Sequence, residues 1–260
     1  MKLAYALAVL ALLASMVASP ASAQEHRWTV TPYVWLPSVD GNLRFETPSG
    51  ARPEVEASPD DYLENVDMGL LLAGEYRGDD WAIFTDLMYF DLSNESASVR
   101  TVSGPGGTQI PIDAGSQLNF KGGLWTLGAG YELTDYGNYT LEAFAGFRYL
   151  GADAQLNWSF SGPLNQFPQS GSVDGEEDIW DGLVGVRGEV RAGDWFFPYY
   201  LDVGAGSSDL TLQVMGGVGY RFGGWDIRAV YRHLYYEQGD DSLINNIAMS
   251  GPAFGANFRF

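Results

Sequence analysis

The chain alternates between apolar and polar residues over many short stretches. Between Tyr139 and Leu150, one set of alternate positions is wholly apolar, whereas the other set carries Glu142, Arg148 and a glycine. Because successive side chains of a β-strand point to opposite faces, this period of two predicts a strand that separates two unlike environments. The same pattern recurs in four further stretches: 66–77, 180–190, 210–222 and 225–235. We therefore expect an all-β protein.

Ten such strands are expected, and the connections between them are of two kinds. The strands lie near 28–36, 66–77, 81–91, 118–133, 139–150, 178–190, 195–204, 210–222, 225–236 and 247–260. Tight turns rich in Gly and Asp occur at 78–80, 134–138, 191–194 and 223–224. Longer connections occupy 37–65, 92–117, 160–177 and 237–246, with a shorter one near 205–209. Short turns at one end and long loops at the other are typical of outer-membrane barrels. We predict a transmembrane antiparallel up-and-down β-barrel of about ten strands, with eight or twelve as alternatives.

Aromatic residues flank the tight turns and both ends of the strand series. They are Trp28, Tyr76, Trp81, Tyr131, Tyr139, Trp195, Phe222, Trp225 and Phe260. Trp and Tyr favour the zone between lipid head groups and hydrocarbon, because their rings are apolar yet can hydrogen-bond. A soluble β-sandwich has no reason to place such a ring at one height. The arrangement therefore favours a barrel that lies in a membrane.

The polar face of the strands is expected to line the lumen of the barrel. It carries Asp67, Glu75, Asp86, Glu142, Asp181, Glu189, Asp202 and Asp226, together with Arg77, Arg148, Arg187, Arg221, Arg228, Arg232 and Arg259. The two signs nearly balance, and burying such charges is costly unless they pair. Glycines on the same face leave room for long side chains: Gly69, Gly146, Gly185, Gly217 and Gly219. We expect a structural ion-pair network that largely fills the lumen rather than a catalytic cluster.

The composition of the chain and its N-terminal segment limit the possible binding partners and the cellular location. The chain has 33 acidic and 14 basic residues, a net charge of −19, and no cysteine. This charge argues against nucleic acid as a partner. Residues 1–23 have a basic start, an apolar run and an Ala-x-Ala exit, which is the layout of a cleaved signal peptide. The barrel then comprises residues 24–260, and the expected location is the outer membrane of a bacterium.

The excess acid lies in the long connections. It comprises Glu54, Glu56, Asp60, Asp61 and Glu64, then Asp174, Glu176, Glu177 and Asp178, then Asp240 and Asp241. These residues are expected to be solvated outer-loop charges, and divalent cations are the partner they would suit. No calcium-loop spacing is present, so we assign no metal site. Ser58-Pro59-Asp60-Asp61 matches the start of a short helix, in which the two Asp residues serve as caps.

The two terminal strands have features of their own. The first carries Pro32, which cannot donate to a β-ladder, so we expect it at the seam with the last strand, where Pro252 interrupts in the same way. The chain ends with Phe254, Phe258 and Phe260 on one face. A terminal aromatic strand resembles the C-terminal signature of bacterial outer-membrane barrels, and this resemblance implies recognition of Phe260 by the barrel-assembly machinery.

The N-terminal part also resembles a known group. The segments TPYVWLPSVDGNLRF and VEASPDDYLENVDMGLLLAGEYRGDDWAIFTDLMYFDLS resemble uncharacterised bacterial outer-membrane barrel proteins with a TPYxWLP-type first strand. The likeness covers about the first 95 residues. It implies an outer-membrane location and carries over no catalytic residue. The remainder has only a generic likeness to small barrels of the OmpA and OmpW type, and architecture does not fix function.

An enzymatic role is the first alternative. A lipid-modifying hydrolase or a protease in this membrane would need a base, usually His, and the chain has only His26 and His233. His26 precedes the first strand, and His233 shares the apolar, lipid-facing set of its strand. Ser242 or Ser250 would be the nucleophile, but their spacing along the chain does not support a site. We therefore assign no catalytic, cofactor-binding or metal-binding residue.

The preferred hypothesis is an integral outer-membrane barrel with a structural or narrow-channel role, since ten strands enclose a tube that side chains can largely fill. Its membrane partner is outer-membrane lipid. A second alternative is a surface binding or adhesion protein that presents loop aromatics, namely Trp158, Phe160, Phe167 and Tyr236.

Overall fold

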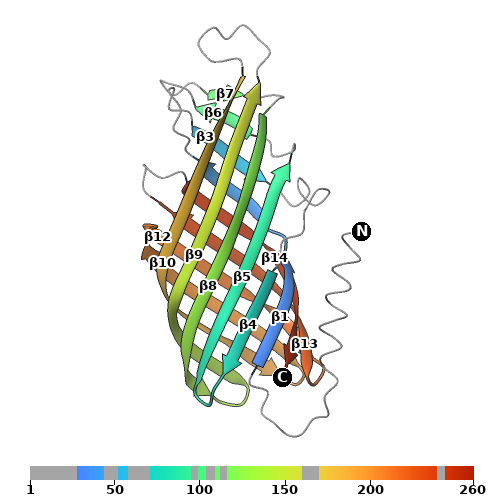
Figure 1. Ribbon diagram of the computed structural model, residues 1–260. Helices are drawn as coiled ribbons and strands as arrows, with labels where there is room; N and C mark the ends of the chain where they lie inside the picture. Colours follow the sequence, from blue (N-terminus) through green and yellow to red (C-terminus); the bar gives the residue numbers. More distant parts are fainter. Residues whose placement is uncertain are drawn as a thin grey trace.

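The protein is an antiparallel β-barrel. A computed structural model describes residues 28–43, 52–57, 71–94, 99–103, 109–111, 116–159, 170–238 and 244–260. These residues form fourteen strands of one sheet, and ten of the strands close into the barrel (Figure 1). Among the described residues there is no helix that is long and apolar enough to cross a bilayer.

The ten barrel strands follow one another in chain order around the tube. They are β1 (Trp28–Trp35), β4 (Leu71–Arg77), β5 (Trp81–Asn94), β8 (Ser116–Asp135), β9 (Tyr139–Ser159), β10 (Ser170–Ala192), β11 (Trp195–Gly206), β12 (Leu210–Arg221), β13 (Trp225–Glu237) and β14 (Ile244–Arg259). Each strand pairs antiparallel with its neighbour, and β1 closes the barrel on β14. All ten strands predicted from the alternation are present, which confirms both the fold class and the preferred strand number.

Four further short strands extend the sheet beyond the barrel. They are β2 (Ser38–Leu43), β3 (Arg52–Ala57), β6 (Val99–Ser103) and β7 (Gln109–Pro111). They lie within stretches expected to be loops, so that expectation was wrong for them. The reason is that β14 continues past the end of β1 and offers its free edge to β2, with Ser250 opposite Ser38. The sheet then continues through β3 and β6 to β7.

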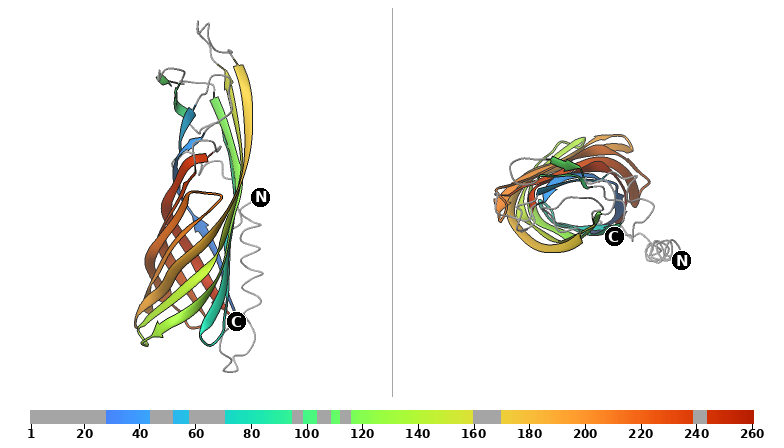
Figure 2. Two further views of the ribbon diagram at one scale, coloured as in Figure 1. Left: turned by 90° about the vertical axis from the view of Figure 1, so that its left-hand side faces the viewer. Right: turned by 90° about the horizontal axis from the view of Figure 1, so that it is seen from above.

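The long strands β8, β9 and β10 also project past the short ones at the same end of the molecule (Figure 2). The β9–β10 ladder runs from the Tyr139–Val190 pair to the Ser159–Ser170 pair. Residues 170–177 were expected to belong to a long connection, but they continue β10. The helix expected at 58–65 lies outside the described residues.

Tight turns connect the strands at the opposite end, as predicted. The turn glycines Gly137, Gly193 and Gly223 have φ angles of 77°, 64° and 88°. This left-handed region is strained for residues that carry a Cβ. Nothing lies within 4 Å of a Cβ placed on any of the three, so backbone conformation alone accounts for these glycines.

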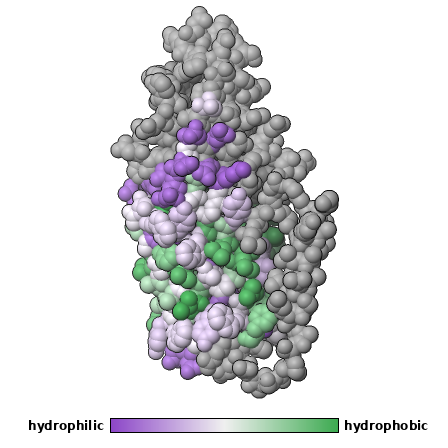
Figure 3. Space-filling view, viewed as in Figure 1, coloured by the Kyte–Doolittle hydropathy of each residue, from purple (hydrophilic) through white to green (hydrophobic). Residues whose placement is uncertain are grey.

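The outer surface of the barrel carries the apolar set of residues. Val184 is 58% exposed, whereas its neighbour on the opposite face, Leu183, is buried. Figure 3 shows a hydrophobic band on this surface, with hydrophilic residues gathered above it. The orientation expected from the alternation is therefore confirmed: the apolar side chains coat the outside.

Aromatic rings cluster on the outside at both edges of this band. At the turn end, Trp28 and Tyr76 lie 4.7 Å apart between ring centroids, and Phe222 and Trp225 lie 4.5 Å apart. This is the belt expected beside the tight turns. At the loop end, Trp180 lies near both Phe147 and Tyr149, and this second cluster was not predicted.

The seam between β1 and β14 includes the predicted proline. Pairing between the two strands is present at Val30–Phe258 and again at Tyr33–Gly255, but no pairs are formed between these points. Pro32 lies in this interval and pairs instead with Leu72 of β4. Its missing N–H therefore falls on an interrupted part of the ladder, as expected. At the upper end of the seam, Leu36 N donates to the carbonyl of Pro252 at 3.0 Å.

Inward-facing glycines make room for large side chains. A Cβ on Gly128 would lie 2.4 Å from the ring of Phe84, and one on Gly219 would lie 2.1 Å from the ring of Phe196. A Cβ on Gly130 would meet Glu142 at 2.0 Å. Of the glycines predicted to have this role, Gly185 and Gly219 lie against the rings of Phe144 and Phe196 and confirm it, although these side chains are aromatic rather than charged. The prediction is wrong for Gly146 and Gly217, where a Cβ would meet backbone atoms first, and Gly69 lies outside the described residues.

We predict that Gly128→Ala destabilises the barrel by about 1–3 kcal/mol, because overpacking forces the Phe84 ring out of place. Urea unfolding in lipid vesicles measures the effect. Gly216→Ala is the matched control: it also lies in a barrel strand, but its Cβ would meet nothing closer than 4.0 Å, so it should change stability by less than about 0.5 kcal/mol. Equal stability of the two variants would contradict the packing argument.

Candidate functional site in the barrel lumen

The lumen carries the charged residues that the alternation assigned to it. Ten of the fifteen line one continuous cavity: Glu75, Arg77, Asp86, Glu142, Arg187, Glu189, Arg221, Arg228, Arg232 and Arg259. Arg148, Asp181, Asp202 and Asp226 are buried on the same inward face. Asp67 lies outside the described residues. The prediction of a polar lumen is thus confirmed for every residue that can be tested.

Near the turn end, arginines and carboxylates form ion pairs between strands. Arg187 Nε donates to Glu142 Oε1 at 2.6 Å, and its Nη1 lies 2.9 Å from Glu75 Oε2. Arg77 pairs with the same two carboxylates, at 2.9 Å from Glu75 and 3.1 Å from Glu142. Glu75 and Glu142 come from strands on different sides of the tube, so this four-membered cluster ties β4, β9 and β10 together.

A second group of ion pairs lies lower, next to the turns. Glu189 accepts hydrogen bonds from Arg191, at 2.7 Å, and from Arg221. Asp226 accepts from Arg259 and from Asn257 Nδ2, the latter at 2.7 Å. Most of these pairs join residues on the same strand or on nearby strands. The side chains therefore lie along the wall and do not fill the centre.

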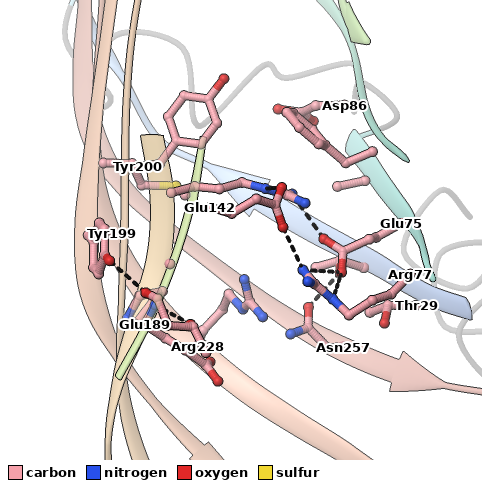
Figure 4. A pocket seen from close by; sticks show the side chains of 18 of the residues that line it. Thr29, Glu75, Arg77, Asp86, Glu142, Glu189, Tyr199, Tyr200, Arg228 and Asn257 are labelled. Carbon is pink, nitrogen blue, oxygen red and sulfur yellow. Dashed lines mark hydrogen bonds and ion pairs between the residues drawn. The ribbon is translucent and has the colours of Figure 1, made fainter. Parts of the chain in front are cut away.

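The result is a cavity of about 700 Å³ in the half of the lumen nearest the turns, which we call the lower cavity. All ten barrel strands contribute to its lining, from Asp79, Asp135 and Arg191 at the turns up to Gln213 and Arg232. Figure 4 shows charged side chains from several strands converging on this space. The sequence predicted a lumen that side chains largely fill, and the lower cavity corrects that expectation for this half of the tube.

At mid-height, Arg232 reaches across the lumen. Its guanidinium lies 2.8 Å from Asp86 Oδ2, on the other side of the barrel, and donates to Gln213 Oε1 at 2.6 Å. Tyr33 donates to Asp86 Oδ1 at 2.6 Å. The ring of Trp35 lies 4.9 Å from the same guanidinium. One arginine thus connects β1, β5, β12 and β13.

Arg148 forms a second cross-link on the loop side of Arg232. Both of its terminal nitrogens donate to Asp202, and it also donates to Thr126 at 3.2 Å and Thr211 at 3.1 Å. Tyr200 donates to Asp202 at 2.6 Å. The Arg148 and Asp202 side chains have no solvent exposure. Such a pair is stable only when its hydrogen bonds are nearly complete, and here they are.

An aromatic cluster fills the space between these polar groups. Phe84 and Phe144 lie 5.1 Å apart in an edge-to-face arrangement, and Tyr200 lies 5.1 Å from Phe144. Met215 packs against the three rings. The Arg187 guanidinium lies 3.8 Å from the centroid of Phe84, so the cluster also contacts the ion pairs below it. We call this cluster, Arg232 and Arg148 with their partners the mid-barrel layer.

Beyond the mid-barrel layer, the inward face becomes apolar. The buried residues there are Leu124, Leu150, Ile179, Leu234, Tyr236, Ile247 and Met249. Sequence analysis missed this upper core, although a signal was present. Near the loop end, pairs such as Leu124–Trp125 and Leu234–Tyr235 are apolar on both faces of the strand. When both faces of a strand are apolar, the side chains that point to the lumen are expected to be buried from water, like those that point to lipid.

The upper core also corrects one expected loop residue. Tyr236 was expected to present an exposed ring, but it lies in β13 and is fully buried. Trp158 lies in β9 rather than in a loop. Phe160 and Phe167 lie outside the described residues.

His233 and Ser250 meet on the outer surface of the barrel. They face each other across the β13–β14 ladder, and His233 Nδ1 lies 2.6 Å from Ser250 Oγ. Sequence analysis placed His233 on the lipid-facing set but found no spacing that joined it to a serine. The missing information was the strand register, which only the tertiary structure gives. His26 and Ser242 lie outside the described residues.

The acidic residues of the loop end are spread along β10 within the described part of the chain. Asp174, Glu176 and Asp178 point outward and are exposed, and Asp178 accepts a hydrogen bond from Tyr149 at 2.5 Å. The described residues contain no group of three or more His, Asp and Glu side chains arranged to hold a metal ion. Asp60 and Asp61, which were expected to cap a helix, lie outside the described residues. So do the acidic loop residues Glu64, Asp240 and Asp241.

We predict that Arg148→Met destabilises the barrel by about 3–5 kcal/mol, because it leaves Asp202 buried without its charge partner. The double variant with Asp202→Asn should recover part of this loss, since it also removes the isolated charge. Urea unfolding in lipid vesicles compares the three proteins. Additive losses in the double variant would contradict the pairing.

Comparisons with known proteins agree on the fold. No family profile and no characterised protein matches the chain by sequence. The outer membrane protease OmpT from Escherichia coli is structurally similar, with a TM-score of 0.51 and 10% identity over 94% of this chain and 100% of that chain. Weaker similarities include Neisserial surface protein A, with a TM-score of 0.34 and 13% identity over 90% of this chain and 97% of that chain. OprG from Pseudomonas aeruginosa has a TM-score of 0.36 and 8% identity over 90% of this chain and 96% of that chain.

At these identities the similarity concerns the fold alone. The predicted likeness to small outer-membrane barrels is confirmed at that level, whereas the likeness to proteins with a TPYxWLP-type strand stays a prediction. The chain therefore has the fold of outer-membrane β-barrel proteins.

Proposed function

We propose that the protein is an integral outer-membrane barrel with a structural role and a lumen closed at mid-height, so that it conducts few or no ions. The observation that carries this proposal is the cross-lumen contact of Arg232 with Asp86, supported by the buried Arg148–Asp202 pair. Above both, the upper core leaves buried apolar side chains where an open pore would need a wet path. A ten-stranded tube is narrow enough for single side chains to bridge it.

The proposed location rests on the outer surface. An apolar band bordered by two groups of aromatic rings matches the hydrocarbon layer and its two interfaces. The turn end then faces the periplasm and the extended sheet faces outward, as in barrels of this kind. Phe260 is exposed at the turn end, paired with Trp28, and we include its recognition by the barrel-assembly machinery in the proposal.

We predict that the purified protein needs detergent to stay in solution and shows no steady conductance in planar lipid bilayers. A closed mid-barrel layer leaves no continuous water path for ions. Single-channel recording measures this, with a general porin as the positive control. Steady, large conductance would overturn the proposal.

Cysteine labelling provides a control for that prediction, because the native chain has no cysteine to compete. Ala73 lines the lower cavity, whereas Ala152 is buried on the inward face near the loop end. A water-soluble maleimide should label Ala73→Cys and should leave Ala152→Cys unlabelled until the protein is unfolded. Labelling of both would show that water reaches the whole lumen.

A second candidate function, lipid hydrolysis, is favoured by the contact between His233 and Ser250. A hydroxyl next to an imidazole can act as a nucleophile with its base. The described residues supply no carboxylate hydrogen-bonded to His233, and both residues lie in paired strands whose N–H groups serve the ladder. We rank this function second, since two polar groups on an apolar surface also satisfy each other.

We predict that the wild-type protein does not hydrolyse phospholipid in vesicles and that His233→Ala leaves this result unchanged. Release of fatty acid from labelled phosphatidylethanolamine vesicles is the measurement. Hydrolysis by the wild type that His233→Ala and Ser250→Ala both abolish would reverse the ranking. Surface binding through loop aromatics stays a prediction for Phe160 and Phe167, which lie outside the described residues.

A further inference from the structure

Arg228 differs from the other arginines of the lower cavity. Seven arginines line this space, and six of them donate at least one hydrogen bond to a carboxylate: Arg77, Arg187, Arg191, Arg221, Arg232 and Arg259. Within the described residues, Arg228 contacts a carboxylate only through an ion pair, with 3.6 Å between its Nη2 and Asp226 Oδ1. That distance is too long for a hydrogen bond. The Arg228 side chain is partly exposed to the cavity, with 29% of its surface accessible.

The loose contact follows from the other partners of Asp226. Its Oδ1 accepts from Asn257, whose own Oδ1 accepts from Thr31 at 2.5 Å, and its Oδ2 accepts from Arg259. Asp226 is fully buried and held in this network. It therefore cannot turn toward Arg228 without breaking hydrogen bonds that are already formed.

The charge around Arg228 is also uneven. Arg221 and Arg228 lie against the same ring, with their guanidinium carbons 4.9 Å and 5.6 Å from the centroid of Phe196. Together with Arg259 they form a group of three cations. Arg221 pairs with Glu189, whereas Arg228 and Arg259 share Asp226. Glu189 also pairs with Arg191, which in turn lies 3.8 Å from Asp135. Counted together, four arginines meet three carboxylates next to Arg228, so one positive charge remains locally, whereas the lining of the whole cavity has seven arginines and seven carboxylates. Inside a narrow protein tube such a charge is screened less than on an open surface.

The lower cavity gives a solute access to this charge. Its volume of about 700 Å³ is within the usual range of small-molecule sites, which is roughly 300–1,000 Å³. Its lining includes turn residues such as Asp79 and Asp135, whereas the mid-barrel layer closes the other side. In Figure 4, Arg228 extends from the wall toward Asn257.

We propose that Arg228 is the anchor of a binding site in the lower cavity for a small solute that carries an oxyanion, either a carboxylate or a phosphate. A planar guanidinium suits such groups because it donates two parallel hydrogen bonds to their oxygens. The remaining positive charge of the Arg221, Arg228 and Arg259 group supplies the matching electrostatics. Entry is from the turn end, and this direction alone rests on the proposed closure of the lumen.

The test uses the full-length barrel in detergent, titrated by calorimetry with inorganic phosphate and separately with acetate. The wild type should bind at least one of the two anions saturably. Arg228→Gln should weaken that binding by about tenfold or more, as expected when a charge-assisted hydrogen bond of at least 1.4 kcal/mol is lost. Arg228→Lys should weaken it less, because the charge stays while the paired donor geometry is lost.

The matched control is Arg191→Gln. It removes the same charge from the lining of the same cavity, but at a residue already hydrogen-bonded to Glu189. Binding in this variant should stay within about threefold of the wild type, because the guanidinium of Arg191 donates to Glu189 and to the carbonyl of Gly137 rather than to the anion. An equal loss in both variants would show general attraction and an adventitious ion only.

Two further results would overturn the site: absence of saturable binding of either anion to the wild type, or unchanged binding in Arg228→Gln. Thermal unfolding checks that each variant is folded before titration. These outcomes are distinct from failure of the proposed function, because a conducting barrel can still bind an anion at Arg228 and a closed barrel can fail to do so.

Discussion

A narrow barrel forces its charged side chains to find partners inside the tube, and the rest of the structure depends on this constraint. Arg232 reaches Asp86 from the opposite side of the lumen, and Arg148 fixes Asp202 with both of its terminal nitrogens. Neither side chain of the second pair touches solvent. A buried ion pair contributes little to stability over an apolar equivalent, but removing one partner is costly. These pairs therefore specify how the strands face each other more than they strengthen the barrel.

The position of a charge along the tube determines whether it closes the lumen or lines it. Close to the turns, carboxylates such as Glu189 and Asp226 pair with arginines on the same or nearby strands, and the centre stays open. At mid-height Arg232 and Asp86 come from strands on opposite sides of the tube and meet across it, whereas Arg148 and Asp202 come from β9 and β11, which only β10 separates. Toward the loops the inward face is apolar and packs as an ordinary core. The inward-facing side chains thus change from the charged lining of the lower cavity to the mid-barrel layer and then to the buried residues of the upper core.

This gradient relates the proposed function to the proposed ligand site. The proposed closure at the mid-barrel layer argues for a structural barrel, whereas the lower cavity beneath that layer contains Arg228, the proposed anchor of the ligand site. The outer surface has a different constraint, because only apolar or mutually satisfied groups are stable against hydrocarbon. The His233–Ser250 contact meets that requirement without any catalytic role.

Much of the fold was predictable because strand periodicity is a local property. The alternation predicted all ten barrel strands and the inward direction of every charge that could be tested. The Gly and Asp content of the short connections predicted the tight turns. Each of these features depends on neighbouring residues alone. The extra strands β2, β3, β6 and β7 were missed, because they form only where β14 outlasts β1 and leaves an edge to pair with.

The sequence by itself determined that charged residues point inward and apolar residues point outward, because successive side chains of a strand point to opposite faces of the sheet. Only the tertiary structure decided which charge meets which. Strand register and barrel closure bring Arg232 to Asp86 across 146 positions of the chain, leave Arg228 with an already occupied carboxylate, and place His233 beside Ser250. Distances across a closed tube depend on all ten strands at once, so no local pattern encodes them.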